Sequence, residues 1–217
     1  MNLYPSAKKH SLQFQKIGIM ADSHGSPEAI KAGIIFLKNR NCHLIYHLGD
    51  ICDSHRPETA NECVRLLKEN EILAIKGNND YAILLSRDKE LIHKTTHQYL
   101  EILPLIRERG NALFVHSLPF TEELGLSAMI GVMRKSIAKR FFKEFDQHIL
   151  FRGHSHSPQI TYQIEGKITK TNINEGEKIY LKQFLPCIIT CGALTEGLCM
   201  IWDQEQSSIA CLSFPFK

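Results

Sequence analysis

Apolar and polar positions in the first part of the chain follow two alternating periodicities. Short apolar runs rich in isoleucine and leucine predict three strands, at residues 16–22, 43–50 and 71–78. The segments between them repeat apolar residues every three to four positions, which predicts a helix ending near Asn41 and a second helix over residues 57–70. This strand–helix–strand–helix–strand order predicts a parallel sheet with helices packed on its faces.

The first helix also carries a start signal. Ser26 suits the N-cap position and Pro27 the first turn, where its missing N–H costs nothing. Behind them Ile30, Ile34 and Leu37 fall on one face of the helix. We therefore expect this helix to begin at Pro27 and to bury that face against the sheet.

The second half of the chain contains shorter segments of mixed pattern. Residues 81–103 have a helical pattern that Pro104 ends, and an RGN turn between two strand-like runs predicts a hairpin over residues 105–117. A basic amphipathic helix over residues 133–146 leads into the apolar run HILF, and further short strands joined by turns follow. We therefore expect an α/β fold whose second, strand-rich layer is mostly antiparallel.

Composition bounds the class of protein. The chain has 217 residues, 43% hydrophobic and 23% charged, which suits one domain over residues 16–217 after a short lead-in at residues 1–15. A formal charge of +3 is too small to favour nucleic acid or anionic membrane as a partner, and no apolar run is long enough to span a bilayer. Seven scattered cysteines without a CxxC pair favour free thiols in a reducing cytoplasm. The oligomeric state stays open, a homo-oligomer included.

Residues that can bind metal ions follow the predicted strands. They are Asp22 and His24 in ADSHG, Asp50 and Asp53 in LGDICD, Asn78, Asn79 and Asp80 in GNND, His116 in VHS, and His154 and His156 in GHSH. Each group taken singly is also common turn or cap chemistry. Because ligand sites in open α/β sheets lie beyond the carboxyl ends of the strands, we expect these groups to converge on one rim. His43 and His47 lie inside a strand pattern, and we interpret them as structural.

The two histidines of GHSH raise a question of geometry. His154 and His156 are two residues apart at the end of a predicted strand, and alternation sends such residues to one face. A separation of about 7 Å would let each ring reach a different ion. Gly153 would let the backbone pass close to the metals.

The donor types indicate a particular kind of metal centre. Oxygen and imidazole ligands without thiolate suit manganese, iron, zinc or similar ions. Seven side chains are too many for one tetrahedral ion and suit two ions about 3.5–4 Å apart, the arrangement used for in-line displacement at phosphorus. Two dications, two aspartates and a bridging hydroxide would leave the site about one charge positive, which favours an anionic phosphoester. The predicted ligands are Asp22, His24, Asp50, Asn78, His116, His154 and His156.

The ordered series ADSH, GD, GNND, VHS and GHSH resembles the signature of the calcineurin-like metallophosphoesterase superfamily, and most of all its small single-domain bacterial and archaeal phosphodiesterases. The resemblance extends from residue 16 to about residue 195. It implies a sandwich of two mixed β-sheets with flanking helices. It also implies two divalent ions, with manganese as the first choice and iron, zinc, nickel or cobalt as alternatives, and a small phosphorylated substrate.

The resemblance further implies a role for each ligand. Asp22, His24 and His156 would hold one ion, while Asn78, His116 and His154 would hold the other. Asp50 would bridge the two ions. The implied reaction is direct in-line attack by a hydroxide that bridges the metals, without a covalent phosphoenzyme.

One position departs from the family pattern. Many members have a histidine after the GN asparagine, where it serves as a general acid or holds the phosphate, and this chain has Asn79. An amide can donate a hydrogen bond to a phosphate oxygen but cannot deliver a proton. This favours diesters with good leaving groups over alkyl monoesters, because a lost general acid costs about 10²–10⁴-fold. His55 is a candidate substitute for the general acid. The phosphatase pattern GDxxDRG has an arginine for which this chain offers Arg56, two residues further along.

Other functions fit the same resemblance. A phosphomonoesterase or protein phosphatase and a dinucleoside polyphosphate hydrolase are alternative activities. A non-catalytic scaffold is a third alternative, although a scaffold has no need for a complete ligand set. A nuclease ranks below these, since the chain is short and nearly neutral.

Overall fold

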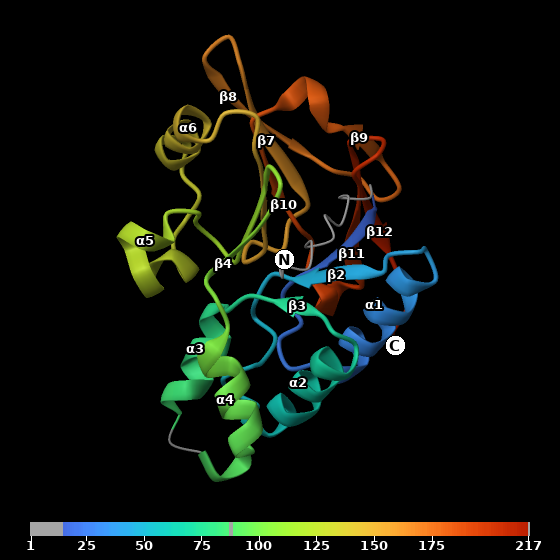
Figure 1. Cartoon of the computed structure of the whole chain (residues 1–217), viewed down its shortest axis with the longest axis vertical. Helices are drawn as coiled ribbons and strands as arrows, with labels where there is room; N and C mark the ends of the chain where they lie inside the picture. Colours follow the sequence, from blue (N-terminus) through green and yellow to red (C-terminus); the bar gives the residue numbers. More distant parts are fainter. Residues whose placement is uncertain (1–14, 87–88, 217) are drawn as a thin grey trace, which may run out of the picture.

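Two six-stranded mixed sheets lie face to face in the computed structural model, which describes residues 15–86 and 89–216 (Figure 1). The predicted lead-in therefore lies outside the described residues except for Gln15. In spatial order the first sheet contains β3 (Leu73–Ala74), β2 (Leu44–His47), β1 (Lys16–Met20), β11 (Leu198–Asp203), β12 (Ser208–Ser213) and β9 (Lys178–Tyr180). The second contains β4 (Ile106–Arg109), β5 (Ala112–Val115), β6 (Ile149–Arg152), β10 (Cys187–Thr190), β7 (Gln159–Ile164) and β8 (Lys167–Asn172).

Helices flank both sheets, so the predicted sandwich of two mixed sheets is confirmed. Figure 1 shows the first four helices gathered beside β1, β2 and β3, while the other two lie beside the second sheet. The helices are α1 (Pro27–Lys38), α2 (Ala60–Glu69), α3 (Asn78–Leu85), α4 (Lys94–Ile102), α5 (Thr121–Leu124) and α6 (Lys135–Glu144). Short 3₁₀ turns cover Pro57–Thr59, Lys89–Leu91, Gly125–Met129, Leu181–Phe184 and Leu194–Glu196.

Strand alternation builds three layers of core. On β5, Phe114 points between the two sheets, where its ring stacks on Tyr46 of β2 at 3.9 Å between centroids. Leu113 and Val115 of the same strand point outward and pack with Phe141 of α6. A third cluster lies between the first sheet and its helices. Both faces of the central strands are buried, which explains their continuous apolar runs.

The parallel order of β1, β2 and β3 confirms the βαβαβ prediction. Ser26 caps α1 as expected, since its hydroxyl oxygen accepts a hydrogen bond from Ala29 N at 3.3 Å. The third strand is much shorter than predicted, because pairing with β2 covers Leu73 and Ala74 only. The chain then turns at Gly77, the N-cap of α3, so that Asn78 begins a helix and does not end a strand.

The second layer is less uniformly antiparallel than expected. The hairpin of β4 and β5 forms as predicted, with Ile106 opposite Val115. However, β6 pairs in parallel with both β5 and β10 at the centre of the second sheet. The helical segment from α5 to α6 returns the chain to the other end of the sheet, which a parallel pair requires. The strand β8 was not predicted, because most of its residues are exposed and polar.

Candidate metal centre

The seven predicted ligands come together at the carboxyl ends of the central strands of both sheets. Two groups have all their ligand atoms within 4.8 Å of one another, and they are Asp22 with His24 and His156, and Asp50 with His116 and His154. The Asn78 side chain joins the second group, since its Oδ1 lies 3.0 Å from His116 Nε2. The convergence expected from strand ends therefore occurs, although the seven residues span 135 positions of sequence.

Most of these ligand residues have a left-handed backbone. Positive φ angles occur at Asp22 (56°), His24 (41°), Asp50 (53°), His154 (68°) and His156 (58°). Non-glycine residues in this region cost about 1–3 kcal/mol each and persist only where the surrounding structure enforces them. Strain gathered at one rim in five separate residues is typical of a functional site.

The strand geometry that we expected for GHSH is wrong. β6 ends at Arg152, and His154 and His156 lie in a turn beyond it. The left-handed turn, and not strand alternation, aims the two rings. His154 Nδ1 lies 3.1 Å from His116 Nε2, whereas His156 Nε2 lies 3.0 Å from His24 Nε2. The two rings therefore face different clusters.

Hydrogen bonds between loops set the position of the first group. The backbone N–H of Asp22 donates to Gly49 O at 3.1 Å, and that of His24 donates to Asp50 O at 3.0 Å. The Asp22 carboxylate in turn accepts from the backbone N–H of His154 at 3.0 Å. Gly153 permits this approach, because a Cβ there would lie 2.8 Å from Asp22 Oδ2.

The second group gathers its electron-pair donors around His116 Nε2. His116 Nδ1 donates to the carbonyl of Leu48 at 2.7 Å, which leaves Nε2 as the lone-pair atom. That Nε2 lies 3.0 Å from Asn78 Oδ1 and 3.5 Å from Asp50 Oδ1. Two ligand atoms at a right angle, each about 2.1 Å from an ion, lie about 3.0 Å apart. A bound cation fits this arrangement, since lone pairs facing one another otherwise repel.

The buried carboxylates also favour bound cations. Burial raises the pKa of Asp22 well above its usual range, and repulsion from Asp50 raises it further. Burial also raises the pKa of Asp80 to about 7, again with repulsion from Asp50. Asp80 is not directed at either cluster, because its carboxylate accepts from the backbone N–H groups of Cys52 and Gly77, both at 2.9 Å. Cations beside Asp22 and Asp50 would relieve this repulsion.

Asn79 supports Asp50 in this structure. Its backbone N–H donates to Asp50 Oδ1 and its side-chain Nδ2 donates to Asp50 Oδ2, both at 2.8 Å. Its Oδ1 accepts from the hydroxyl of Ser54 at 3.1 Å. The side chain therefore orients the central carboxylate, and the predicted contact between Asn79 and a phosphate oxygen stays a prediction.

Residues 53–56 form a turn beside the centre. Asp53 pairs with Arg56 at 2.9 Å and does not join either cluster. The guanidinium of Arg56 also donates to His24 O at 2.5 Å, so it steadies the loop of a predicted ligand. His55 is exposed, and in the described part of the chain no side-chain hydrogen bond links it to the clusters. Its role as an acid stays a prediction.

Two supporting residues lie behind the ligands. His47 is buried as a structural residue should be, and its Nε2 lies 3.0 Å from the hydroxyl of Ser23, between Asp22 and His24. Burial lowers the pKa of His47 to about 3, so the ring stays neutral. Sequence reasoning missed Arg152, which is buried at the end of β6. A charged residue at the end of the apolar run HILF was the available signal.

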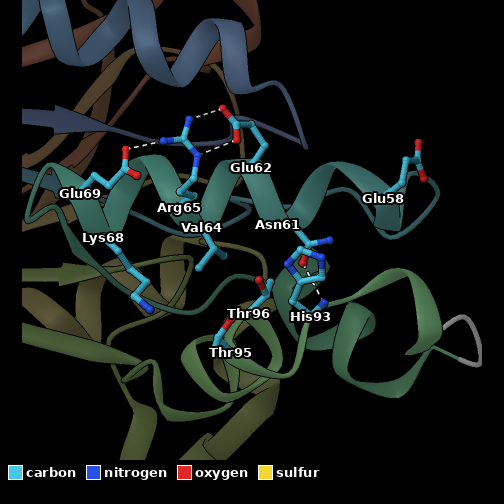
Figure 2. Close-up of a pocket in the computed structure, with 10 residues that line it drawn as sticks. All are labelled: Glu58, Asn61, Glu62, Val64, Arg65, Lys68, Glu69, His93, Thr95 and Thr96. Carbon is cyan, nitrogen blue, oxygen red and sulfur yellow. Dashed lines mark hydrogen bonds and ion pairs between the residues drawn. The ribbon is translucent and has the colours of Figure 1, made fainter.

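A groove of about 540 Å³ opens elsewhere, between α2 and the start of α4 (Figure 2). Among its lining residues, Arg65 pairs with Glu62 and Glu69, and the Asn61 Oδ1 accepts a hydrogen bond from His93 N. None of the predicted ligands lines this groove. The candidate metal centre is therefore separate from it.

Metal binding at pH 6 should release protons from carboxyl groups. The raised pKa of Asp22 and of Asp80 favours their protonated forms, whereas burial lowers the pKa of His116 to about 4 and leaves that ring neutral. Metal affinity should therefore rise as the pH rises towards and through 7. Calorimetry with Mn²⁺ in two buffers of different ionisation enthalpy measures the released protons.

Two variants identify the source of those protons. Asp22→Asn should reduce the release at saturating Mn²⁺, because the variant has no proton to lose there. Asp146→Asn, at an exposed carboxylate beyond α6, should leave it unchanged. Binding of Mn²⁺ to the unmodified protein without proton release would contradict the prediction.

The chain is similar in sequence to known proteins. The model of the calcineurin-like phosphoesterase superfamily domain matches residues 16–183. Uncharacterized protein MJ0912 of Methanocaldococcus jannaschii is 28% identical over 199 residues, which cover 83% of this chain and 76% of the relative. In the described residues no helix is long and apolar enough to cross a membrane.

Solved structures share the fold. A metallophosphoesterase from Sphaerobacter thermophilus superposes with a TM-score of 0.77 at 23% identity, covering 94% of this chain and 89% of that one. A novel archaeal phosphodiesterase superposes with a TM-score of 0.50 at 16% identity, covering 92% and 100%. At these identities the likeness concerns the fold.

Proposed function

Because the chain belongs to the calcineurin-like phosphoesterase superfamily, we propose that it is a metal-dependent phosphodiesterase with two divalent ions and with Asp50 between them. The observation that carries the proposal is the pair of three-residue clusters at one rim, each combining one buried aspartate with two histidines. In a two-metal site, ions side by side stabilise both the attacking and the leaving oxygen of an in-line displacement at phosphorus.

Each cluster has the donors for one ion. Asp22, His24 and His156 would hold the first. His116, His154 and Asn78 would hold the second, with Asp50 shared. Manganese is our choice of metal, since oxygen and imidazole donors without thiolate suit it.

Bound ions would supply a deprotonated water for in-line attack and neutralise charge on the phosphoryl oxygens. The chain itself holds the ligands in place. Asn79 fixes both oxygens of Asp50, and the Leu48 carbonyl fixes the tautomer of His116. The two aspartates leave the site positive when two dications are present, and this attracts an anionic substrate.

The substrate class follows from the position of Asn79. Its amide donates to Asp50 and has no proton to give to a leaving group. We infer that the substrate is a small phosphodiester whose leaving alcohol needs little protonation.

The seven cysteines of the chain are all free and buried, which supports a reducing compartment such as the cytoplasm.

The purified protein should hydrolyse bis-p-nitrophenyl phosphate faster than p-nitrophenyl phosphate in Mn²⁺. Asn79→His should raise the rate on alkyl monoesters relative to the rate on diesters by about tenfold or more. The reason is that an imidazole ring at this position can deliver a proton to a poor leaving group. Rates of each variant on aryl and alkyl monoesters and diesters measure this shift.

Asn79→Ala is the matched control. It removes the hydrogen bond to Asp50 without adding a proton donor, so both activities should fall together and their ratio should stay constant. A wide preference of the unmodified protein for the monoester would show that the inference from Asn79 is wrong.

A further inference from the structure

Arg152 places a buried guanidinium beside the metal centre. The residue is 2% exposed and ends β6, two positions before His154. Its Nε donates to the carbonyl of Ser117 at 2.9 Å, and its Nη2 donates to the Ser117 hydroxyl at 3.1 Å. Its Nη1 donates to the hydroxyls of Ser155 at 2.7 Å and Thr190 at 3.3 Å. These four hydrogen bonds therefore all end on neutral oxygens.

These acceptors lie next to predicted ligands. Ser117 follows His116 in the chain, and Ser155 lies between His154 and His156. One side chain therefore joins the loop of His116 to the turn that carries the other two histidines. The two segments follow adjacent strands, since Val115 of β5 pairs with Arg152, while Thr190 lies opposite Arg152 on β10 at its other side.

Stability alone does not account for this residue. Burial lowers the pKa of Arg152, and the charge of Asp22 opposes this from a distance, but within the described residues no carboxylate lies within 4.0 Å of the guanidinium to form a salt bridge. A buried cation without an ion pair costs several kcal/mol in desolvation. An apolar residue at this position would continue the buried strand without this desolvation cost. We therefore infer that the site uses the several N–H donors of the planar guanidinium, here called the fork.

We propose that Arg152 is a positioning residue for the metal centre, holding His116 and the His154–His156 turn at the separation that two ions require. The proposal rests on the two-metal function given above. The planar guanidinium suits the task because its donors point in fixed directions to both loops at once. A lysine has the same charge but presents its donors from a single point.

Arg152→Lys tests the geometry at constant charge. We expect about tenfold to a hundredfold weaker binding of Mn²⁺ in calorimetry, the usual cost of losing a partner that orients metal ligands. We also expect a changed spectrum of the coupled manganese pair in electron paramagnetic resonance. Circular dichroism of the metal-free variant reports whether it folds.

Arg65→Lys is the matched control. Arg65 also makes several hydrogen bonds, to Glu62 and Glu69, but on the exposed face of α2 away from the ligands. This variant should bind Mn²⁺ as the unmodified protein does. If Arg152→Lys does not fold, Ser155→Ala decides the question, because Ser155 is exposed and its loss removes one bond of the fork. We expect that variant to bind Mn²⁺ severalfold more weakly.

The outcomes separate this inference from the proposed function. If the unmodified protein binds fewer than two Mn²⁺ ions, the proposed function fails, and the role of Arg152 fails with it. The deciding variant is Arg152→Lys if it folds and Ser155→Ala if it does not. If the unmodified protein binds two Mn²⁺ ions and the deciding variant binds them with an affinity within twofold and with the same spectrum, only the role of Arg152 is overturned. Weaker binding and a changed spectrum in the deciding variant, with Arg65→Lys unaffected, support it.

Discussion

Asp50→Ala protein should bind at most one Mn²⁺ ion and lose at least about a thousandfold in phosphodiesterase activity. Asp50 is 2% exposed, and its Oδ1 lies 3.5 Å from His116 Nε2 in the second cluster. Its charge also raises the pKa of His24 in the first cluster, against the larger lowering by burial, so its field reaches both groups. Without the shared carboxylate, less negative charge would offset the repulsion between two ions and one would be lost, so water at the site would keep a pKa closer to that of bulk water.

Metal analysis of the purified variant and rates on bis-p-nitrophenyl phosphate measure the two effects. Asp146→Ala is the control, because Asp146 is an exposed carboxylate beyond α6 and lies in neither cluster. It should retain both ions. Full occupancy by two ions in Asp50→Ala would show that Asp50 is not the bridge.

Gly77→Ala should disrupt the centre by steric displacement alone. The φ of Gly77 is −100°, which alanine tolerates, so the backbone conformation is not the obstacle. A Cβ there would lie 2.1 Å from Asp50 N and 2.3 Å from Asp50 Oδ1. Because backbone atoms cannot rotate away as a side chain can, the Asp50 loop must move relative to Asn78, the first residue of α3. We expect Mn²⁺ affinity to fall at least about tenfold, together with a stability loss of about 1–3 kcal/mol.

Gly166→Ala provides the control for adding a methyl group. Gly166 lies in the turn between β7 and β8 with φ at 77°, and nothing lies within 4 Å of its added Cβ. The left-handed backbone should cost about 1–2 kcal/mol there, while Mn²⁺ affinity stays unchanged. Denaturant unfolding and calorimetry of both variants separate stability from metal binding. Unchanged Mn²⁺ affinity in Gly77→Ala would mean that the contact with Asp50 is not part of the centre.

The convergence of the candidate ligands could be predicted from sequence because each of them carries a local signal. Each follows an apolar run, and the carboxyl ends of neighbouring parallel strands meet at one edge. Asp22 and Asp50 follow β1 and β2 in this way, and they lie beside each other as expected. Periodicity likewise determined the helices α1 and α2 and the hairpin of β4 and β5, whose residues interact over short sequence distances.

Tertiary structure alone decided how the ligands are aimed. The left-handed turns at His154 and His156 are held by contacts such as the bond from His154 N to Asp22, which joins residues 132 positions apart. No local pattern encodes such a bond, so strand alternation gave a wrong reason for the direction of the two rings. The orientation of Asn79 towards Asp50 has the same origin, since it depends on where a loop 29 positions away comes to rest.

The sequence by itself therefore determined which residues meet, and the folded structure determined what each one faces. Strand ends and motif order select the donors, because they depend on local periodicity and on the direction of the chain. The buried fork of Arg152, the approach of Gly77 to Asp50 and the division of four histidines into two pairs depend on contacts between residues distant in sequence. Such contacts are a property of the whole chain, because each exists only after the segments that make it have packed together.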